Sequence, residues 1–277
     1  FVGSRGLGDV YKRQIEHHAN IIPWQMAAKK YGLNIKYIKI DDSYNLDLDH
    51  LNSLLTSKTK IVSIVGESNM SGMLPNIKEI VSNVKSKSDA IFILDGAQLV
   101  PHRFVDVQDL GIDFLCVSGH KMLGPTGIGV VWGRKELWDS MDPVYGGGDM
   151  IEEVYYDKAT WAPVPHKFEA GTPPFVEAIG LGVAAEYLMN ISMSEVQQHS
   201  DSLREYAKSK LENIDGLNVI HSISKNAGCT FAMSVEGAHA ADISLMLDTY
   251  GVAVRAGHHC VQPCLLYTSP SPRDPTK

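Results

Sequence analysis

The sequence predicts an α/β fold with a wound, mainly parallel sheet and a smaller α+β domain at its C-terminal end. Short apolar runs rich in Val and Ile alternate with amphipathic windows of helical period, which is typical of βαβ units. Residues 143–174 then form a Gly, Pro and aromatic stretch that is too long for an ordinary connection, which favours a functional loop. Two long helical windows follow it. We therefore expect a large domain at residues 15–189 and part of a small domain at residues 190–263.

The elements are predicted in order along the chain. Strands of the large domain are expected where apolar β-branched residues cluster, at residues 34–40, 60–65, 90–94, 113–117 and 127–132. Helices are expected between them at residues 21–31, 48–55 and 75–84, the last with proline in its first turn, where a missing N–H costs no hydrogen bond. A further helix is expected at residues 176–189, at the end of the large domain. The smaller domain is expected to contain helices at residues 193–214 and 240–250, and strands at residues 218–220, 230–235 and 252–255.

Both ends of the chain are predicted to be foreign to the protein. Residues 4–14 (SRGLGDVYKRQ) and residues 264–274 (CLLYTSPSPRD) back-translate to one DNA sequence read in opposite directions. That sequence resembles a transposase adapter used in sequencing libraries, and such segments are excluded from fold reasoning. We expect residues 1–14 and 264–277 to be adapter-like tails, and the rest to be a fragment cut at both ends.

Composition argues against several function classes. The formal net charge is −7 and Lys and Arg do not cluster, so no nucleic-acid partner is expected. No apolar run approaches the roughly 20 residues that span a bilayer, so no membrane segment is expected. Outside the tails, Cys116, Cys229 and Cys260 form an odd, widely spaced set, which favours a reducing, cytoplasmic compartment over a disulfide framework. Organelle targeting stays open, because the true N-terminus lies outside the sequence.

Polar side chains follow two predicted strands at the points where the strands end. Asp95 ends FILD, and Lys121 follows FLCVS after a Gly-His turn. Ligands of open α/β sheets bind beyond the carboxyl ends of the strands. A partly desolvated amine there can form a Schiff base, and a carboxylate keeps a pyridine nitrogen protonated so that the ring accepts electrons. Alone, Lys121 is as readily a solvated loop lysine and Asp95 a turn residue.

Together with their surroundings, these residues resemble class V aminotransferase-fold enzymes, specifically SufS-like, group II cysteine desulfurases. The resemblance runs from IEHHANIIPWQ at residue 15 through ESNMSG and EAGTP to VRAGHHCVQP, essentially the whole remaining chain. It implies pyridoxal-phosphate-dependent fold type I and the conversion of L-cysteine to L-alanine. It also implies a homodimer with shared active sites, and sulfur delivery to a SufE- or SufU-type acceptor protein for iron-sulfur cluster assembly.

The resemblance assigns a role to each matching residue. Lys121 would bind pyridoxal 5′-phosphate covalently, and His17 would stack on the cofactor ring and help in proton transfer. The other cofactor contacts are Asp95 at the ring nitrogen, Gln98 at the ring hydroxyl, and Ser118, His120 and Thr172 at the phosphate, with Thr172 reaching the neighbouring subunit. The resemblance also implies that Asn69 and Arg255 hold the substrate carboxylate. The guanidinium of Arg255 is suited to this role, because it can bind a carboxylate through two hydrogen bonds.

The same resemblance makes Cys260 the residue that attacks the substrate sulfur and carries it as a persulfide. Free cysteine is more often a small buried apolar residue than a nucleophile. The Gly-His-His-Cys segment is polar, however, and such surroundings favour the thiolate. Cys116 and Cys229 are interpreted as structural.

Other hypotheses stay open at the level of sequence. A selenocysteine lyase, or another class V lyase or aminotransferase, keeps the same fold and cofactor. A non-catalytic metal-binding or partner module would use zinc ligands among His17, His18, His258, His259 and Cys260, but adjacent histidines lack the spacing that lets a pair converge on one ion, so no metal is expected. Glu67 stands where the family has histidine or a small residue, Val261 replaces an alanine, and the family's Gly-Thr-Thr phosphate turn is missing, so the activity of the fragment itself is open.

Overall fold

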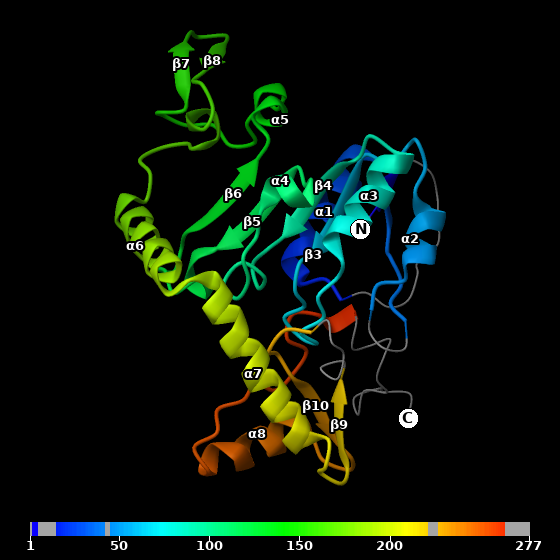
Figure 1. Ribbon diagram of the computed structural model, residues 1–277. Coiled ribbons are helices and arrows are strands. Elements are labelled where there is room, and N and C mark those ends of the chain that lie inside the picture. Colours follow the sequence, from blue (N-terminus) through cyan, green and yellow to red (C-terminus); the bar gives the residue numbers. More distant parts are fainter. Residues whose placement is uncertain (1, 5–14, 42–44, 221–226, 264–277) are drawn as a thin grey trace.

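A six-stranded sheet forms the core of the larger part of the chain (Figure 1). The computed structural model describes residues 2–4, 15–41, 45–220 and 227–263. In spatial order the strands are β2 (Asn34–Lys36), β1 (Val2–Ser4), β3 (Ile61–Val65), β4 (Ile91–Asp95), β5 (Phe114–Ser118) and β6 (Gly129–Gly133). The central strands β3, β4 and β5 pair in parallel and the outer pairs are antiparallel. The predicted α/β architecture is confirmed, with parallel pairing limited to its centre.

Four helices of this part of the chain accompany the sheet, two before β3 and two after it. They are α1 (Ile22–Tyr31), α2 (Leu48–Leu54), α3 (Ile77–Lys87) and α4 (Val107–Leu110). Asn76 caps the N-terminus of α3, where its side chain accepts a hydrogen bond from the Glu79 N–H, and the apolar face of the helix is buried. That face packs against Phe92 and Leu94 of β4, which are fully buried. Burying each side chain of this size contributes about 1.5–3 kcal/mol to folding.

The remaining elements are not part of the six-stranded sheet (Figure 1). They are α5 (Lys135–Ser140), β7 (Ile151–Val154), β8 (Ala159–Trp161), α6 (Phe175–Ile191), α7 (Met193–Leu211), β9 (Leu217–Ile220), β10 (Ala232–Val235) and α8 (Ala240–Thr249). Helices α6 and α7 meet at 74°, and α7 leads from the sheet to the antiparallel β9–β10 pair. No single helix in the described ranges is long and apolar enough to cross a membrane, and α6 with α7 passes that test only as a bent pair.

Several elements differ from the sequence prediction. The stretch at residues 143–174 contains the β7–β8 hairpin, which was expected to be loop. The prediction of a strand at residues 252–255 is wrong. No described strand pairs with this segment, and a strand needs a partner for its backbone groups. Strand β6 is antiparallel to β5, since the ten residues 119–128 between them hold no crossover helix. Backbone pairing places β1 inside the predicted tail, whose foreign origin stays a prediction, as does the boundary near residue 190.

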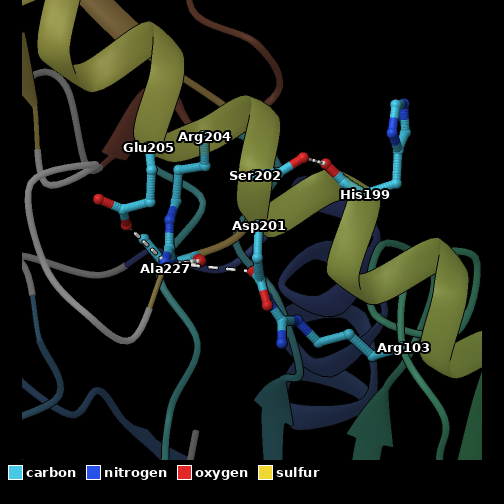
Figure 2. Close-up of polar contacts among 7 residues, drawn as sticks. All are labelled: Arg103, His199, Asp201, Ser202, Arg204, Glu205 and Ala227. Carbon is cyan, nitrogen blue, oxygen red and sulfur yellow. Dashed lines mark hydrogen bonds and ion pairs between the residues drawn. The ribbon is translucent and has the colours of Figure 1, made fainter.

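A polar cluster around the buried Arg204 links α7 to the rest of the molecule (Figure 2). Arg103, from the turn after β4, donates to the Asp201 carboxylate on α7 over 2.9 Å. Arg204, one helical turn further on, donates to the Ala227 carbonyl and also forms a 2.8 Å ion pair with Glu205. The cluster therefore links the turn after β4, the middle of α7 and the chain that leads into β10.

Glu67 lies buried beside this cluster, with only 2% of its surface exposed. A side chain at Gly228 would place its Cβ 2.0 Å from the Glu67 Oε1 atom, so any larger residue there would displace the Glu67 carboxylate. Burial raises the pKa of Glu67 to about 7, although the positive charge of Arg103 lowers it and the negative charge of Asp201 adds to the rise. Its Oε2 atom has no hydrogen-bond partner among the described residues.

We predict that Glu67→Gln changes how stability depends on pH. The unfolded carboxyl titrates near 4.5, so protonated Glu67 favours the folded state below that pH, and this contribution is lost as pH rises through 7. The variant cannot ionise, so its unfolding free energy at pH 8 is expected to exceed that of the wild type by about 2–3 kcal/mol, with little difference at pH 4.5. Urea unfolding over this pH range measures it.

Glu205→Gln is the matched control, because that side chain is 61% exposed. Its effect is expected to stay below about 1 kcal/mol and to vary little with pH. Parallel stability curves for wild type and Glu67→Gln would contradict the prediction.

Candidate active site

The parallel pairing of β4 and β5 brings a carboxylate and an amine to one edge of the sheet. Asp95 is the last residue of β4 and lies opposite Cys116 of β5, and the Gly96 N–H donates to the Cys116 carbonyl over 2.9 Å. Lys121 ends the 3₁₀ turn Gly119–Lys121 that directly follows β5. Both Asp95 and Lys121 are half-buried. The two residues that the sequence placed at neighbouring strand ends therefore lie at the same edge.

His17 belongs to the same electrostatic neighbourhood. It caps the 3₁₀ turn His18–Asn20, and its Nδ1 atom accepts from the Ala19 N–H over 3.1 Å. Burial lowers the pKa of His17, the positive charge of Lys121 lowers it further, and the negative charge of Asp95 opposes both. Arg255 makes a smaller contribution in the same direction as Lys121. Burial and the positive charge of Lys121 therefore favour the neutral imidazole form of His17.

The turns after β4 and β5 carry further polar side chains. The Asp95 Oδ1 atom accepts from the Ala97 N–H over 3.0 Å, and the half-buried Gln98 follows in the same turn. Ser118 Oγ lies 3.0 Å from His120 Nδ1 across the turn that holds Lys121. The turn that contains Lys121 therefore also carries a hydroxyl and an imidazole group, and both are suited to phosphate oxygens.

Cys260 lies at an exposed turn whose backbone is strained. His259 has φ +49° and Cys260 has φ +59°, in the left-handed region that non-glycine residues rarely adopt. Such residues cost about 1–3 kcal/mol each and persist where the surroundings hold them. Here Asn69 Nδ2 donates to the His259 carbonyl over 2.7 Å, and the neighbouring Val261 is fully buried. Asn69, which was predicted to hold substrate, thus contacts the turn of the predicted nucleophile.

The other described cysteines lie in different surroundings. Burial, reinforced by the negative charge of Asp95, raises the pKa of the Cys116 thiol to about 11 and so disfavours its thiolate. Cys229 is exposed, unlike a core residue, and partial desolvation together with Glu67 raises its pKa. Neither cysteine belongs to the turn at residues 257–262.

Two predicted residues are less closely tied to this group. Arg255 is exposed, and its charge also lowers the pKa of His259, which burial lowers first. Thr172 is exposed in the loop before α6, and in the described structure no hydrogen bond links it to the other predicted residues. Within the described ranges, no group of three His, Cys, Asp or Glu side chains could hold a metal ion.

Sequence reasoning missed two residues that the structure brings to the site. Glu16 is 3% exposed and precedes His17 directly. His18 was considered only as a zinc ligand, whereas its backbone N–H donates to the Cys260 carbonyl over 2.8 Å. A charged residue between the apolar Ile15 and a histidine pair was the available signal, because buried carboxylates usually have a specific partner.

Comparison with known proteins gives the family. The chain matches the sequence model of the aminotransferase class-V family over residues 8–270. It is 42% identical over 259 residues to a Haloferax volcanii protein named cysteine desulfurase, and 42% identical over 260 residues to a Streptomyces coelicolor protein named probable cysteine desulfurase. Both matches cover 93% of this chain but only 61% and 62% of those proteins. The chain thus spans about three-fifths of the length of these relatives.

Solved structures agree with the sequence match. The cysteine desulfurase CsdA of Escherichia coli superposes with a TM-score of 0.86 and 36% identity over 91% of this chain and 62% of that chain. The apo cysteine desulfurase of Thermococcus onnurineus gives a TM-score of 0.87 and 33% identity over 93% and 66%. The shared fold is the pyridoxal-phosphate-dependent fold type I. In sequence and in fold, the chain belongs to the aminotransferase class-V family.

Proposed function

We propose that this chain is part of a pyridoxal-phosphate-dependent cysteine desulfurase that converts L-cysteine to L-alanine and carries the sulfur on Cys260. The observation that supports it most is the convergence of three segments. Lys121 and Asp95 lie at one sheet edge, and the charges of both shift the pKa of His17. The next residue, His18, contacts the turn that carries Cys260. The relatives named cysteine desulfurases support the same assignment.

The residues at the sheet edge fit pyridoxal 5′-phosphate. In the described structure neither Asp95 nor Lys121 takes part in an ion pair, although both are half-buried, so both are available to a ligand. Asp95 suits a protonated ring nitrogen and Lys121 suits an aldehyde. The phosphate would take hydrogen bonds from Ser118 and His120.

Further contacts complete the proposed cofactor and substrate site. Gln98 suits the ring hydroxyl, and the planar His17 ring suits stacking on the cofactor ring. The proposed homodimer would add the partner's Thr172 at the phosphate. Asn69 keeps a second amide N–H beyond its bond to the His259 carbonyl, and with Arg255 it would hold the substrate carboxylate.

The chain's own side chains then divide the chemistry. The bound cofactor supplies a ring that withdraws electrons from the substrate's α carbon. Lys121 holds the cofactor and exchanges a proton at that carbon, and neutral His17 accepts or donates one at the neighbouring atoms. Asp95 keeps the ring nitrogen protonated.

The transfer of sulfur from L-cysteine to Cys260 needs no additional oxidant or reductant. The thiolate attacks the substrate sulfur, so that an S–S bond forms on Cys260 and the C–S bond of the substrate breaks. The electron pair of that bond returns to carbon, which takes up a proton and becomes the methyl group of alanine. A SufE- or SufU-type protein in the cytoplasm would then take the sulfur for iron-sulfur cluster assembly.

We predict that Lys121→Ala abolishes the visible absorbance that pyridoxal phosphate gains when its aldehyde condenses with a lysine amine. Wild-type chain incubated with the cofactor should develop this band, and borohydride reduction should fix the label on the peptide containing Lys121. Lys135→Ala is the control, because that lysine is 77% exposed and pairs with Asp139. An equal band in Lys121→Ala would show that another amine is used.

We predict that Cys260→Ala in the full-length protein lowers the conversion of cysteine to alanine by on the order of 100-fold or more, because the sulfur acceptor is lost. Mass spectrometry should detect one extra sulfur on the Cys260 peptide of the wild type after incubation with cysteine. Cys229→Ala should retain both signals. Undiminished alanine formation by Cys260→Ala would exclude the persulfide route.

A further inference from the structure

The segment at residues 15–20 contains a buried hydrogen-bond network that the proposed chemistry does not use. Glu16 Oε1 accepts from the backbone N–H of Val65, the last residue of β3, over 3.0 Å. Glu16 Oε2 accepts from Asn20 Nδ2 over 2.6 Å. Both carboxylate oxygens therefore act as acceptors, and Glu16 is only 3% exposed.

Asn20 extends this network to β3 and α1. Its Oδ1 atom accepts from Ser63 Oγ over 2.6 Å and from Trp24 Nε1 over 3.0 Å. Because two donors face that oxygen, the amide nitrogen must face Glu16, and every side-chain atom of the pair then meets its complement. Asn20 is 8% exposed, so the network is shielded from water.

Two of the residues between Glu16 and Asn20 are histidines that interact with groups of the proposed site. The charges of Lys121 and Asp95 act on His17. His18 holds the nucleophile turn at two points: its backbone N–H donates to the Cys260 carbonyl over 2.8 Å, and its Nε2 atom accepts from the Gln262 N–H over 3.2 Å. The segment is thus fixed to β3 at both ends and contacts the site with its middle.

We propose that Glu16 and Asn20 form a positioning pair that sets where His17 meets the cofactor and where His18 holds the Cys260 turn. The roles of His17 and Cys260 rest on the proposed function, whereas the contacts of the pair do not. Burial raises the pKa of Glu16 to about 7, and the Val65 and Asn20 donors oppose that rise, so these hydrogen bonds help to keep the buried carboxylate ionised.

Single substitutions place like groups against each other. In Glu16→Gln an amide N–H₂ faces the Asn20 amide N–H₂, and in Asn20→Asp two carboxylates face each other. The double variant Glu16→Gln/Asn20→Asp reverses the polarity and restores the bond: the new amide at position 16 donates to the new carboxylate at position 20. Val65, Ser63 and Trp24 keep their acceptors, so the double variant should behave like the wild type.

Backbone hydrogen exchange in this chain, measured without cofactor or cysteine, tests the proposal. The reporter is the Gln262 amide, which His18 protects, and the reference is the Gly96 amide, which pairs with Cys116 between β4 and β5. Each single variant is expected to accelerate exchange at Gln262 about tenfold relative to Gly96, and the double variant to return it to within about threefold of wild type.

Other outcomes would overturn the positioning role. They are unchanged exchange at Gln262, equal acceleration at Gln262 and Gly96, or a double variant as fast as the singles combined. If a single variant fails to fold, Ser63→Ala serves instead, because it removes one donor to Asn20. It should accelerate hydrogen exchange at the Gln262 amide, but not at Gly96, by a smaller factor. Unchanged exchange at Gln262 in this variant also rejects the proposal. Since the measurement needs neither cofactor nor turnover, its failure differs from failure of the proposed desulfurase activity.

Discussion

The parallel pairing of β4 with β5 is the constraint on which the site depends. Parallel strands end at the same edge of a sheet, so the register of Asp95 against Cys116 fixes where the carboxylate lies relative to the turn after β5. That turn contains Gly119, where a Cβ would lie 2.9 Å from the Ile128 carbonyl, so its tight path to Lys121 needs glycine. A shift in the register of these two strands would separate the Lys121 amine from the Asp95 carboxylate, so that one ligand could no longer contact both.

The second part of the site is held by contacts between residues distant in sequence. The turn that carries Cys260 is strained, and it is secured by Asn69 after β3 and by His18 before α1. Val261 anchors the same turn in a small apolar cluster with Ile15 and Val65. Since His18 follows the residue that senses Lys121, the proposed cofactor and nucleophile positions share one support. The hydrogen-bonded segment at residues 15–20 therefore interacts with both positions.

Part of this arrangement could be predicted from the sequence and part could not. Asp95 and Lys121 were predictable because each depends on a local pattern, an apolar strand followed by a polar turn. The burial of Glu16 was not, since it depends on Val65, which is 49 positions away along the chain. The strand expected at residues 252–255 failed for the same reason: local composition suits a strand, but pairing is decided elsewhere. Aromatic and glycine-rich composition concealed the β7–β8 hairpin, because the residues between its two strands, YYDK, include neither the Gly nor the Asn that usually marks a hairpin turn.

The proposed function requires one pyridine ring to contact both Asp95 and Lys121. A crystal structure of the chain soaked with pyridoxal phosphate tests this most directly. We expect the ring nitrogen within about 2.7–3.2 Å of an Asp95 carboxylate oxygen, with the aldehyde carbon bonded to Lys121 Nζ. A ring bound at another lysine, or one whose nitrogen faces away from Asp95, would contradict it.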